Sequence, residues 1–177
     1  MTGDVGVSPS TEITGFPPGI IVGSTHSADP TSAAGIADLT TAYNDLAGRS
    51  LCPVVAAGNL GGETLTPGLY KSTSSLEISS GDLPLDAQGD SAAVFVFQIA
   101  STLTTTPGRQ VILTNGATAN NVYWQVGTSA TLGITSVFQG NILADQSITL
   151  ETGASLTGRA LTRIAAVTLD TNVVTIH

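Results

Sequence analysis

One short pattern, found five times, decides the fold of this chain: TSSLEI (73–78), ASTLTT (100–105), SATLGI (129–134), SITLET (147–152) and AVTLDT (166–171). Each copy carries a leucine with Ser or Thr directly before it. The leucines are separated by 27, 29, 18 and 19 residues. A step of 18 or 19 residues accommodates three strands of about five residues with their corners, which is one turn of a three-sided solenoid. The two longer steps then correspond to turns that carry inserted loops.

Two further sets of segments recur between these copies. We expect a second face from VFVFQI (94–99), VYWQV (122–126), NILAD (141–145) and RALTR (159–163), and a third from QVILTN (110–115), SVFQG (136–140), ASLTG (154–158) and NVVTI (172–176). Glycines that suit tight corners separate the segments, at Gly108, Gly116, Gly127, Gly140, Gly153 and Gly158. The sequence therefore predicts a mostly β chain, folded as a right-handed three-faced β-helix. We expect one domain over 1–177, with its main coils over about 53–177.

One α-helix is predicted over about residues 31–48. Asp29 suits its N-cap and Pro30 its first position, where a missing N–H costs nothing. One apolar stripe is formed by residues at helical spacing, Ile36, Leu39, Tyr43 and Leu46. We expect this stripe to pack along the side of the solenoid. The first 30 residues, rich in Gly and Pro, predict only short strands and turns. Tyr123 and Trp124 alternate, so we expect one in the core and the other against the helix.

Alternation along the repeated pattern separates interior from surface positions. With the copies aligned on leucine, the outward column directly before it is Ser75, Thr102, Thr131, Thr149 and Thr168. The column three before the leucine includes Ser129 and Ser147, and the column after it includes Thr104 together with the acidic residues Glu77, Glu151 and Asp170. Because Thr packs well on a pleated surface, we expect a regular, neutral polar face.

Composition excludes several classes of partner. Charged residues make up 10% of the chain, against roughly 25% in an average soluble domain. The net charge is −8, and the five basic residues form no cluster, so we expect neither nucleic acid nor an anionic membrane surface as a partner. No stretch of about 18 apolar residues exists, so no membrane span is predicted.

Metal and catalytic sites are not expected either. Cys52 is the single cysteine and is predicted to be a small, partly buried hydrophobic residue. Asp86 and Asp90 lack the dense oxygen-ligand spacing of a calcium loop, and His26 and His177 lack Cys or Glu partners at ligand spacing. The chain has no GxSxG elbow, and its carboxylates are too sparse for a polysaccharide-cleaving solenoid. We therefore predict no metal, no cofactor and no enzymatic activity.

Longer segments resemble the domain of secreted microbial ice-binding proteins. They are TGDVGVSP (2–9), ITGF (13–16), TTAYNDLAGR (40–49), GNLGGETLTPGLYKSTSSL (58–76), LDAQGDSAAVFVFQIASTLTT (85–105), NNVYWQVGTSATLG (120–133), GNILADQSITLETGASLTGRALTR (140–163) and AVTLD (166–170). The resemblance implies a discontinuous right-handed β-solenoid, closed at one end by N-terminal strands and flanked by a long helix. It also implies secretion, although no leader follows Met1 here. The family usually has another strand before TGDVGVSP, so we expect an open coil edge that can pair with another chain.

The resemblance implies that the flat Ser/Thr face binds ice. The candidate residues are Ser75, Thr102, Thr104, Ser129, Thr131, Ser147, Thr149 and Thr168. Two alternatives stay open from the residues alone. A Thr ladder also simply favours β structure and solubility, and the acidic residues on the same face hold hydration shells that disturb an ice-like array. Open solenoid ends would also suit a self-associating extracellular structural or adhesive subunit, or a homo-oligomer.

Overall fold

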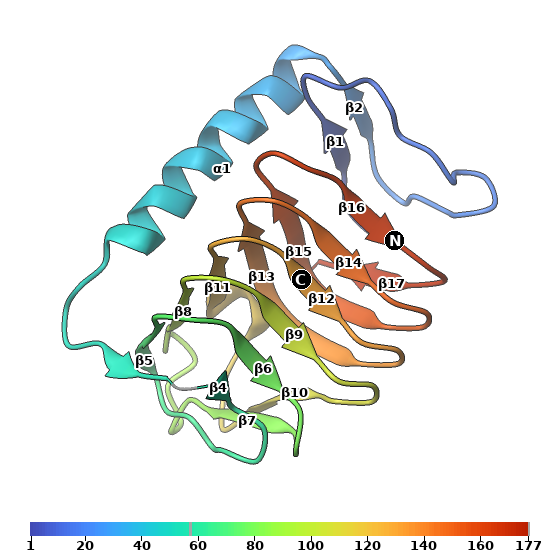
Figure 1. Ribbon diagram of the computed structural model, residues 1–177. Coiled ribbons are helices and arrows are strands. Elements are labelled where there is room, and N and C mark those ends of the chain that lie inside the picture. The colour runs from blue at the N-terminus through green and yellow to red at the C-terminus, as the bar shows by residue number, and fades with distance from the viewer. Residues whose placement is uncertain (57, 177) are drawn as a thin grey trace.

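The protein is a right-handed solenoid of parallel strands with one helix along its side (Figure 1). The computed structural model describes residues 1–56 and 58–176, so His177 lies outside the described residues. The elements in chain order are β1 (Val5–Val7), β2 (Thr25–Ser27), α1 (Pro30–Gly48), β3 (Val54–Val55), β4 (Gly58–Asn59), β5 (Gly68–Ser72), β6 (Leu76–Ile78), β7 (Leu83–Asp86), β8 (Phe95–Ile99), β9 (Leu103–Thr105), β10 (Val111–Thr114), the 3₁₀ turn η1 (Ala119–Asn121), β11 (Val122–Val126), β12 (Ala130–Leu132), β13 (Val137–Ala144), β14 (Ile148–Leu150), β15 (Ser155–Thr162), β16 (Val167–Leu169) and β17 (Val173–Thr175).

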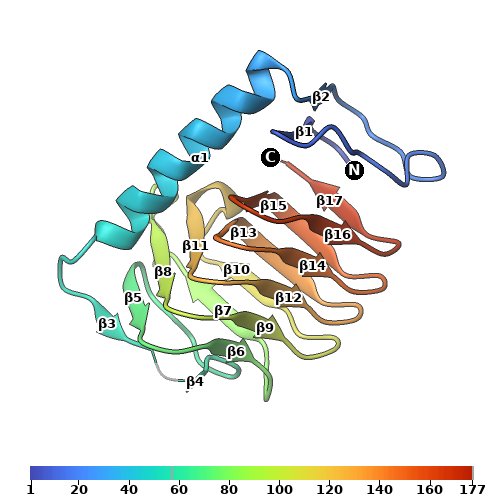
Figure 2. The ribbon, with the colours of Figure 1, turned by 45° about the horizontal axis from the view of Figure 1, so that its top comes forward.

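Three faces surround the core, as the repeats predict. The Thr face is the six-stranded sheet β16-β14-β12-β9-β6-β4. The helix face contains β3, β5, β8, β11 and the second halves of β13 and β15, over residues 141–144 and 159–162. The third face contains β7, β10, β17 and the first halves of β13 and β15. Figure 2 shows successive coils stacked along one axis, with β6, β9, β12, β14 and β16 side by side.

Two glycine corners explain why the last coils are short. β13 and β15 each run unbroken from the third face to the helix face. They bend at Gly140, with φ 111°, and at Gly158, with φ 139°. A Cβ on Gly158 would lie 2.0 Å from the carbonyl oxygen of Gly140, so no other residue fits there. The earlier coils instead carry inserted segments at this corner, between β7 and β8 and between β10 and β11.

The interior is a continuous column of apolar side chains. Phe97 and Trp124 stack with ring centroids 3.9 Å apart, and Tyr70 and Phe138 extend the same aromatic row. Trp124 is fully buried, and its indole Nε1–H donates to the carbonyl of Gln139 at 3.0 Å. Because that donor is satisfied, the row buries its full apolar area without a polar penalty. The expectation for the Tyr123–Trp124 pair is confirmed, since Tyr123 packs with the helix.

Helix α1 begins and packs as its sequence predicts. The Asp29 side chain accepts the Ser32 backbone N–H at 2.8 Å, and the Ser32 hydroxyl bonds back to Asp29, which completes a capping box. Leu39, Tyr43 and Leu46 are buried against the helix face, whereas Ile36 is only half-buried. The apolar stripe therefore attaches the helix along the stack of coils, in contact with Val96, Leu143 and their neighbours.

The register of the Thr face differs from the leucine alignment in one place. Leu76 pairs with Leu103 as aligned, but Leu103 pairs with Ala130, and Thr104 pairs with Thr131. Leu132 then pairs with Leu150. The alignment is therefore two residues out between the second and third copies. A shift of two residues leaves every side chain on its original face, so alternation alone cannot detect it.

Both ends of the solenoid have open strand edges. At one end the outermost strands are β3 and β4. At the other end, Thr2 donates its backbone N–H to Val174 at 2.8 Å, while β1 pairs with β2. Among the described residues, β16 and the second half of β15 have a strand partner on one side only.

Cys52, predicted to be partly buried, is exposed, because it lies in the turn that carries the chain from α1 to β3. Across the described chain, no helix is both long and apolar enough to span a membrane.

Candidate functional site

A column of four threonines runs along the middle of the Thr face. Thr104, Thr131, Thr149 and Thr168 are direct cross-strand partners on β9, β12, β14 and β16. Thr104, Thr131 and Thr149 stand between buried neighbours, so their side chains project outward. Thr168, on the outermost strand of the sheet, is itself exposed and is the cross-strand partner of Thr149. In the described part of the chain, none of their hydroxyls has a protein hydrogen-bond partner. The column therefore offers a row of methyl and hydroxyl groups to solvent.

A second column lies one residue before each strand. Ser75, Thr102, Ser129 and Ser147 follow the same register, and Ala166 ends it. Its hydroxyls bond in pairs: Thr102 donates to Ser75 at 2.8 Å, and Ser147 donates to Ser129 at 2.9 Å. These bonds fix the hydroxyls but also use part of their capacity for water. All eight predicted residues thus lie along the Thr face, in two columns, whereas the leucine alignment mixes the members of the two columns.

The underside of the Thr face is rigid and closely packed. Ile148, Leu132 and Leu150 point inward and are fully buried. Thr105 is the polar exception, and its hydroxyl lies 2.8 Å from that of Ser136 and also accepts the backbone N–H of Gly133 at 2.9 Å. Both hydroxyls are buried and paired, so they hold the sheet to the next corner. Sequence reasoning missed this pair, because its members lie 31 residues apart.

Acidic residues lie at the margins of the Thr face. Glu77 is exposed and occupies the threonine column itself, opposite Thr104. Glu151 and Asp170 lie at the corner after the strands, where Glu151 accepts the backbone N–H of Ile134 at 3.2 Å. The hydroxyls of Thr152 and Thr171 donate to Asp170 and hold the pKa of its carboxyl below the ordinary value. The expectation that all three acids share one column is wrong, because the register moves Glu77 away from the other two.

The carboxylates considered for calcium serve local turns instead. Asp86 accepts the backbone N–H of Gln88 at 2.8 Å and the side-chain amide of Asn115 at 2.9 Å, and these two bonds lower its pKa. Asp90 accepts the backbone N–H of Ala92 at 2.8 Å. Within residues 1–56 and 58–176, no group of three His, Cys, Asp or Glu side chains is placed to hold a metal ion.

Comparison with known proteins agrees with this architecture. A family model described as ice-binding-like matches residues 1–175. The chain is 48% identical to the ice-binding protein of Nostoc sp. (strain HG1), with 97% of this chain and 64% of that protein covered. It is 40% identical to the ice-binding protein of Flavobacterium frigoris (strain PS1), with 99% of this chain and 67% of that protein covered. The chain thus spans about two thirds of the length of these relatives.

Solved structures show the same fold. An ice-binding protein from an Antarctic biological consortium superposes with a TM-score of 0.95 at 55% identity, over 99% of this chain and 80% of that one. The ice-binding protein of Antarctomyces psychrotrophicus superposes with a TM-score of 0.94 at 44% identity, over 99% of this chain and 87% of that one. The mostly parallel β architecture and the single flanking helix are those of these β-helix structures. From the extent of the sequence and structural match, this chain belongs to the family of ice-binding-like proteins.

Proposed function

We propose that this chain binds ice through its Thr face and has an antifreeze function. The single observation that carries the proposal is the row of Thr104, Thr131, Thr149 and Thr168, in register on adjacent strands with their hydroxyls open to solvent. The 48% identity to a relative named as an ice-binding protein supports the same function.

The physical basis is regular spacing on a rigid sheet. Neighbouring strands lie about 4.8 Å apart, and alternate residues along one strand about 6.7 Å apart. Hydroxyls at such intervals can hold waters in a lattice-like array, while the methyl groups exclude disordered water. Each Thr has a stiff χ1, so little side-chain entropy is lost when the array forms. Many simultaneous weak contacts make adsorption effectively irreversible, which blocks further crystal growth.

The two columns are expected to contribute unequally. The threonine column offers unpaired hydroxyls, whereas Thr102 and Ser147 already donate to Ser75 and Ser129. We therefore propose that the threonine column contacts ice directly and that the other column fixes the edge of the array. Glu77 is the next residue of this column after Thr104. Because a carboxylate keeps its own hydration shell, we propose that the ice-binding array ends there.

Thermal hysteresis and inhibition of ice recrystallisation test the proposal. Replacement of Thr131→Tyr or Thr149→Tyr places a ring in the middle of the column and should abolish both activities. Thr157→Tyr is the matched control, because Thr157 projects outward from β15 on the third face. Circular dichroism should show the same melting curve for all three variants. Activity retained by both column variants, or absent from the unaltered chain, would contradict the proposal.

A protein that binds ice must reach the ice surface, so the proposed function bears on the location of the chain. We propose that it acts outside the cell, by adsorption and without catalysis, and that residues 1–177 act as one domain. The resemblance to secreted ice-binding proteins supports the location. None of the comparisons supports the structural or adhesive alternative.

We also propose that copies of the chain associate weakly end to end. Apolar side chains are exposed at both ends of the solenoid: Val55 is 81% exposed on β3, and Val173 is 60% exposed on β17. Parallel edges of complementary polarity would pair head to tail, which is a heterologous contact. Sedimentation velocity over a range of concentrations tests this, and a strict monomer at every concentration would contradict it.

A further inference from the structure

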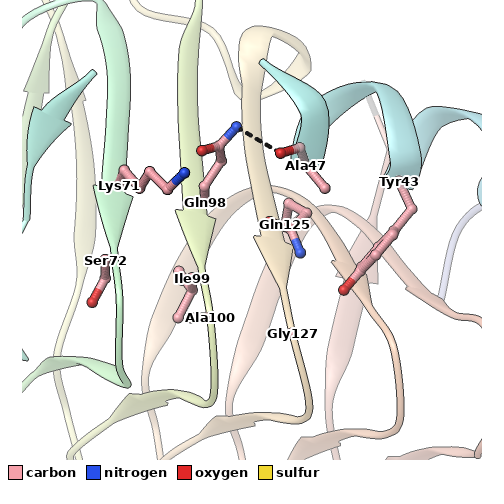
Figure 3. A pocket seen from close by; sticks show the side chains of 9 residues that line it. All are labelled: Tyr43, Ala47, Lys71, Ser72, Gln98, Ile99, Ala100, Gln125 and Gly127. Atoms are coloured by element: carbon pink, nitrogen blue, oxygen red, sulfur yellow. Dashed lines mark hydrogen bonds between the residues drawn. The ribbon is translucent and has the colours of Figure 1, made fainter. Parts of the chain in front are cut away.

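A polar recess lies beside the C-terminal end of α1, on the helix face (Figure 3). It forms because the helix crosses the strands obliquely. Across β5, β8 and β11 the helix packs on the column of Leu69, Val96 and Tyr123. Across β13 and β15 it packs on Leu143 and Leu161, which continue the neighbouring column. The part of that neighbouring column on β5, β8 and β11 is left beside the helix rather than under it.

Three polar side chains occupy this part of the column, of which Gln98 and Gln125 are buried and Lys71 is exposed. Lys71, Gln98 and Gln125 are direct cross-strand partners. With Tyr43 and Ala47 of the helix they line a cavity of about 270 Å³. A water molecule takes about 30 Å³ in the liquid, so the cavity accommodates several waters or one small organic molecule.

Gln98 is buried, with 4% of its surface exposed. The nitrogen of its side-chain amide has hydrogen-bond partners, whereas the oxygen has none. Its amide nitrogen donates to the carbonyls of Leu46 at 2.6 Å and Arg49 at 2.7 Å, with Ala47 at 3.3 Å. Leu46 and Ala47 lie in the last turn of α1 and Arg49 is its C-cap, where carbonyls lack the usual helical partners. The Leu46 carbonyl also accepts the backbone N–H of Arg49 at 3.4 Å. Its carbonyl oxygen, Oε1, is buried and has no hydrogen-bond partner. A buried acceptor left unpaired is costly, so this atom calls for a donor.

Lys71 provides the second unpaired group. Its side chain is exposed, and no ion pair or hydrogen bond to it is found among the described residues. In the view of Figure 3, the Gln98 oxygen is turned away from the helix, to the side on which the Lys71 ammonium ends. The recess therefore places an exposed ammonium donor beside a buried acceptor that has no protein donor.

We propose that this recess binds one small polyhydroxylated molecule, a polyol or monosaccharide, through a pair of adjacent hydroxyls. A hydroxyl both donates and accepts, so one hydroxyl can donate to Gln98 Oε1 while its neighbour accepts from Lys71 and from the Gln125 amide. A cation would be repelled by Lys71, and a fully ionised anion has no proton for Gln98 Oε1. The Tyr43 ring and Ala47 supply the apolar wall against which the carbon skeleton packs. This inference is independent of the ice-binding proposal, because the recess lies on a different face.

The test is a titration followed by nuclear magnetic resonance of the side-chain amides. D-glucose and glycerol are the probes, added to about 100 mM, which covers the millimolar affinities of small ligands. We expect saturable shifts of the Gln98 and Gln125 amide resonances. Lys71→Met should weaken glucose binding about ten-fold, since one charge-assisted hydrogen bond is lost. Gln139→Met, which changes a glutamine on the third face, should leave the affinity unchanged.

Two results would overturn the proposal. One is a set of small shifts that stay linear with concentration and spread over the whole surface, as a general solvent effect produces. The other is saturable binding that Lys71→Met leaves unchanged, which would place the ligand elsewhere. Because Lys71 is exposed and unpaired, its replacement should not impair folding, and an unchanged melting temperature checks this.

Discussion

Glu77 is the direct cross-strand partner of Thr104, so an acidic side chain closes the threonine column at one end. Beyond Glu77 the column continues to Asn59, whose side chain bonds the backbone N–H groups of Gly61 and Ser79 and is used in the turn. The regular part of the proposed ice-binding surface therefore covers the four coils from Thr104 to Thr168.

Replacing Glu77→Thr should raise thermal hysteresis, because it adds one more hydroxyl and methyl in register and removes a hydrated carboxylate. Glu63→Thr is the matched control, since it removes the same charge from an exposed loop outside the Thr face. Both changes are at the surface, so the free energy of unfolding should change by no more than about 0.5 kcal/mol. An equal effect of the two variants would mean that net charge, and not position, sets the activity.

Replacing Gly158→Ala should destabilise the solenoid strongly. The residue has φ 139°, and the added Cβ would lie 2.0 Å from the Gly140 carbonyl oxygen. We expect a loss of at least about 2 kcal/mol in the free energy of unfolding, measured by urea denaturation.

Gly35→Ala serves as the comparison for that variant. Gly35 lies inside α1, and nothing is within 4 Å of a Cβ built on it. Helix propensity predicts a gain of up to about 1 kcal/mol there. If the two variants shifted stability in the same direction, the corner would not have the geometry described.

Acidification should lower the melting temperature, because it protonates carboxylates that cap the helix and hold turns. The pKa of Asp29 lies below its ordinary value of 3.8, chiefly because the Ser32 backbone N–H donates to it, with a further contribution from His26. Asp86 and Asp170 are lowered too. A group with a depressed pKa in the folded state stabilises the fold above its unfolded pKa. That stability is lost as the pH falls through the folded pKa, so the melting temperature should decline below about pH 4.

The variant Asp29→Asn separates charge from capping in that experiment. Asn keeps an acceptor for the Ser32 N–H but carries no charge, so the helix remains capped while its acid sensitivity decreases. Scanning calorimetry between about pH 6 and pH 2 measures both proteins. The same acid-induced decline in the variant and the unaltered chain would show that Asp29 contributes nothing to it.

The sequence alone was sufficient for the three faces, the corners and the helix. Those features depend on local signals: Gly140 and Gly158 at bends, Asp29 before Pro30, and Leu39 and Tyr43 at helical spacing. The sequence alone did not determine the register of the Thr face. Leucine recurs at both inward positions of these short strands, so Leu103 was aligned with Leu132 when its partner is Ala130.

The sequence also did not predict the hydrogen-bond partners of the polar residues in the interior. Gln98 serves carbonyls of α1 about 50 residues earlier in the chain, and Thr105 pairs with Ser136 across a corner. Such contacts depend on how coils stack, which no local pattern encodes. The one signal available was a glutamine pair, Gln98 and Gln125, at equivalent places in otherwise apolar strands.

The measurement that tests the central claim most directly is ice-affinity partition of a mixed sample. Unaltered chain, Thr149→Tyr and Thr157→Tyr are combined in equal amounts, and a single ice crystal is grown slowly in the solution. The account predicts that the unaltered chain and Thr157→Tyr enter the ice while Thr149→Tyr stays in the liquid. Equal partition of all three proteins into the ice, or their common exclusion from it, would contradict the assignment of ice binding to the Thr face.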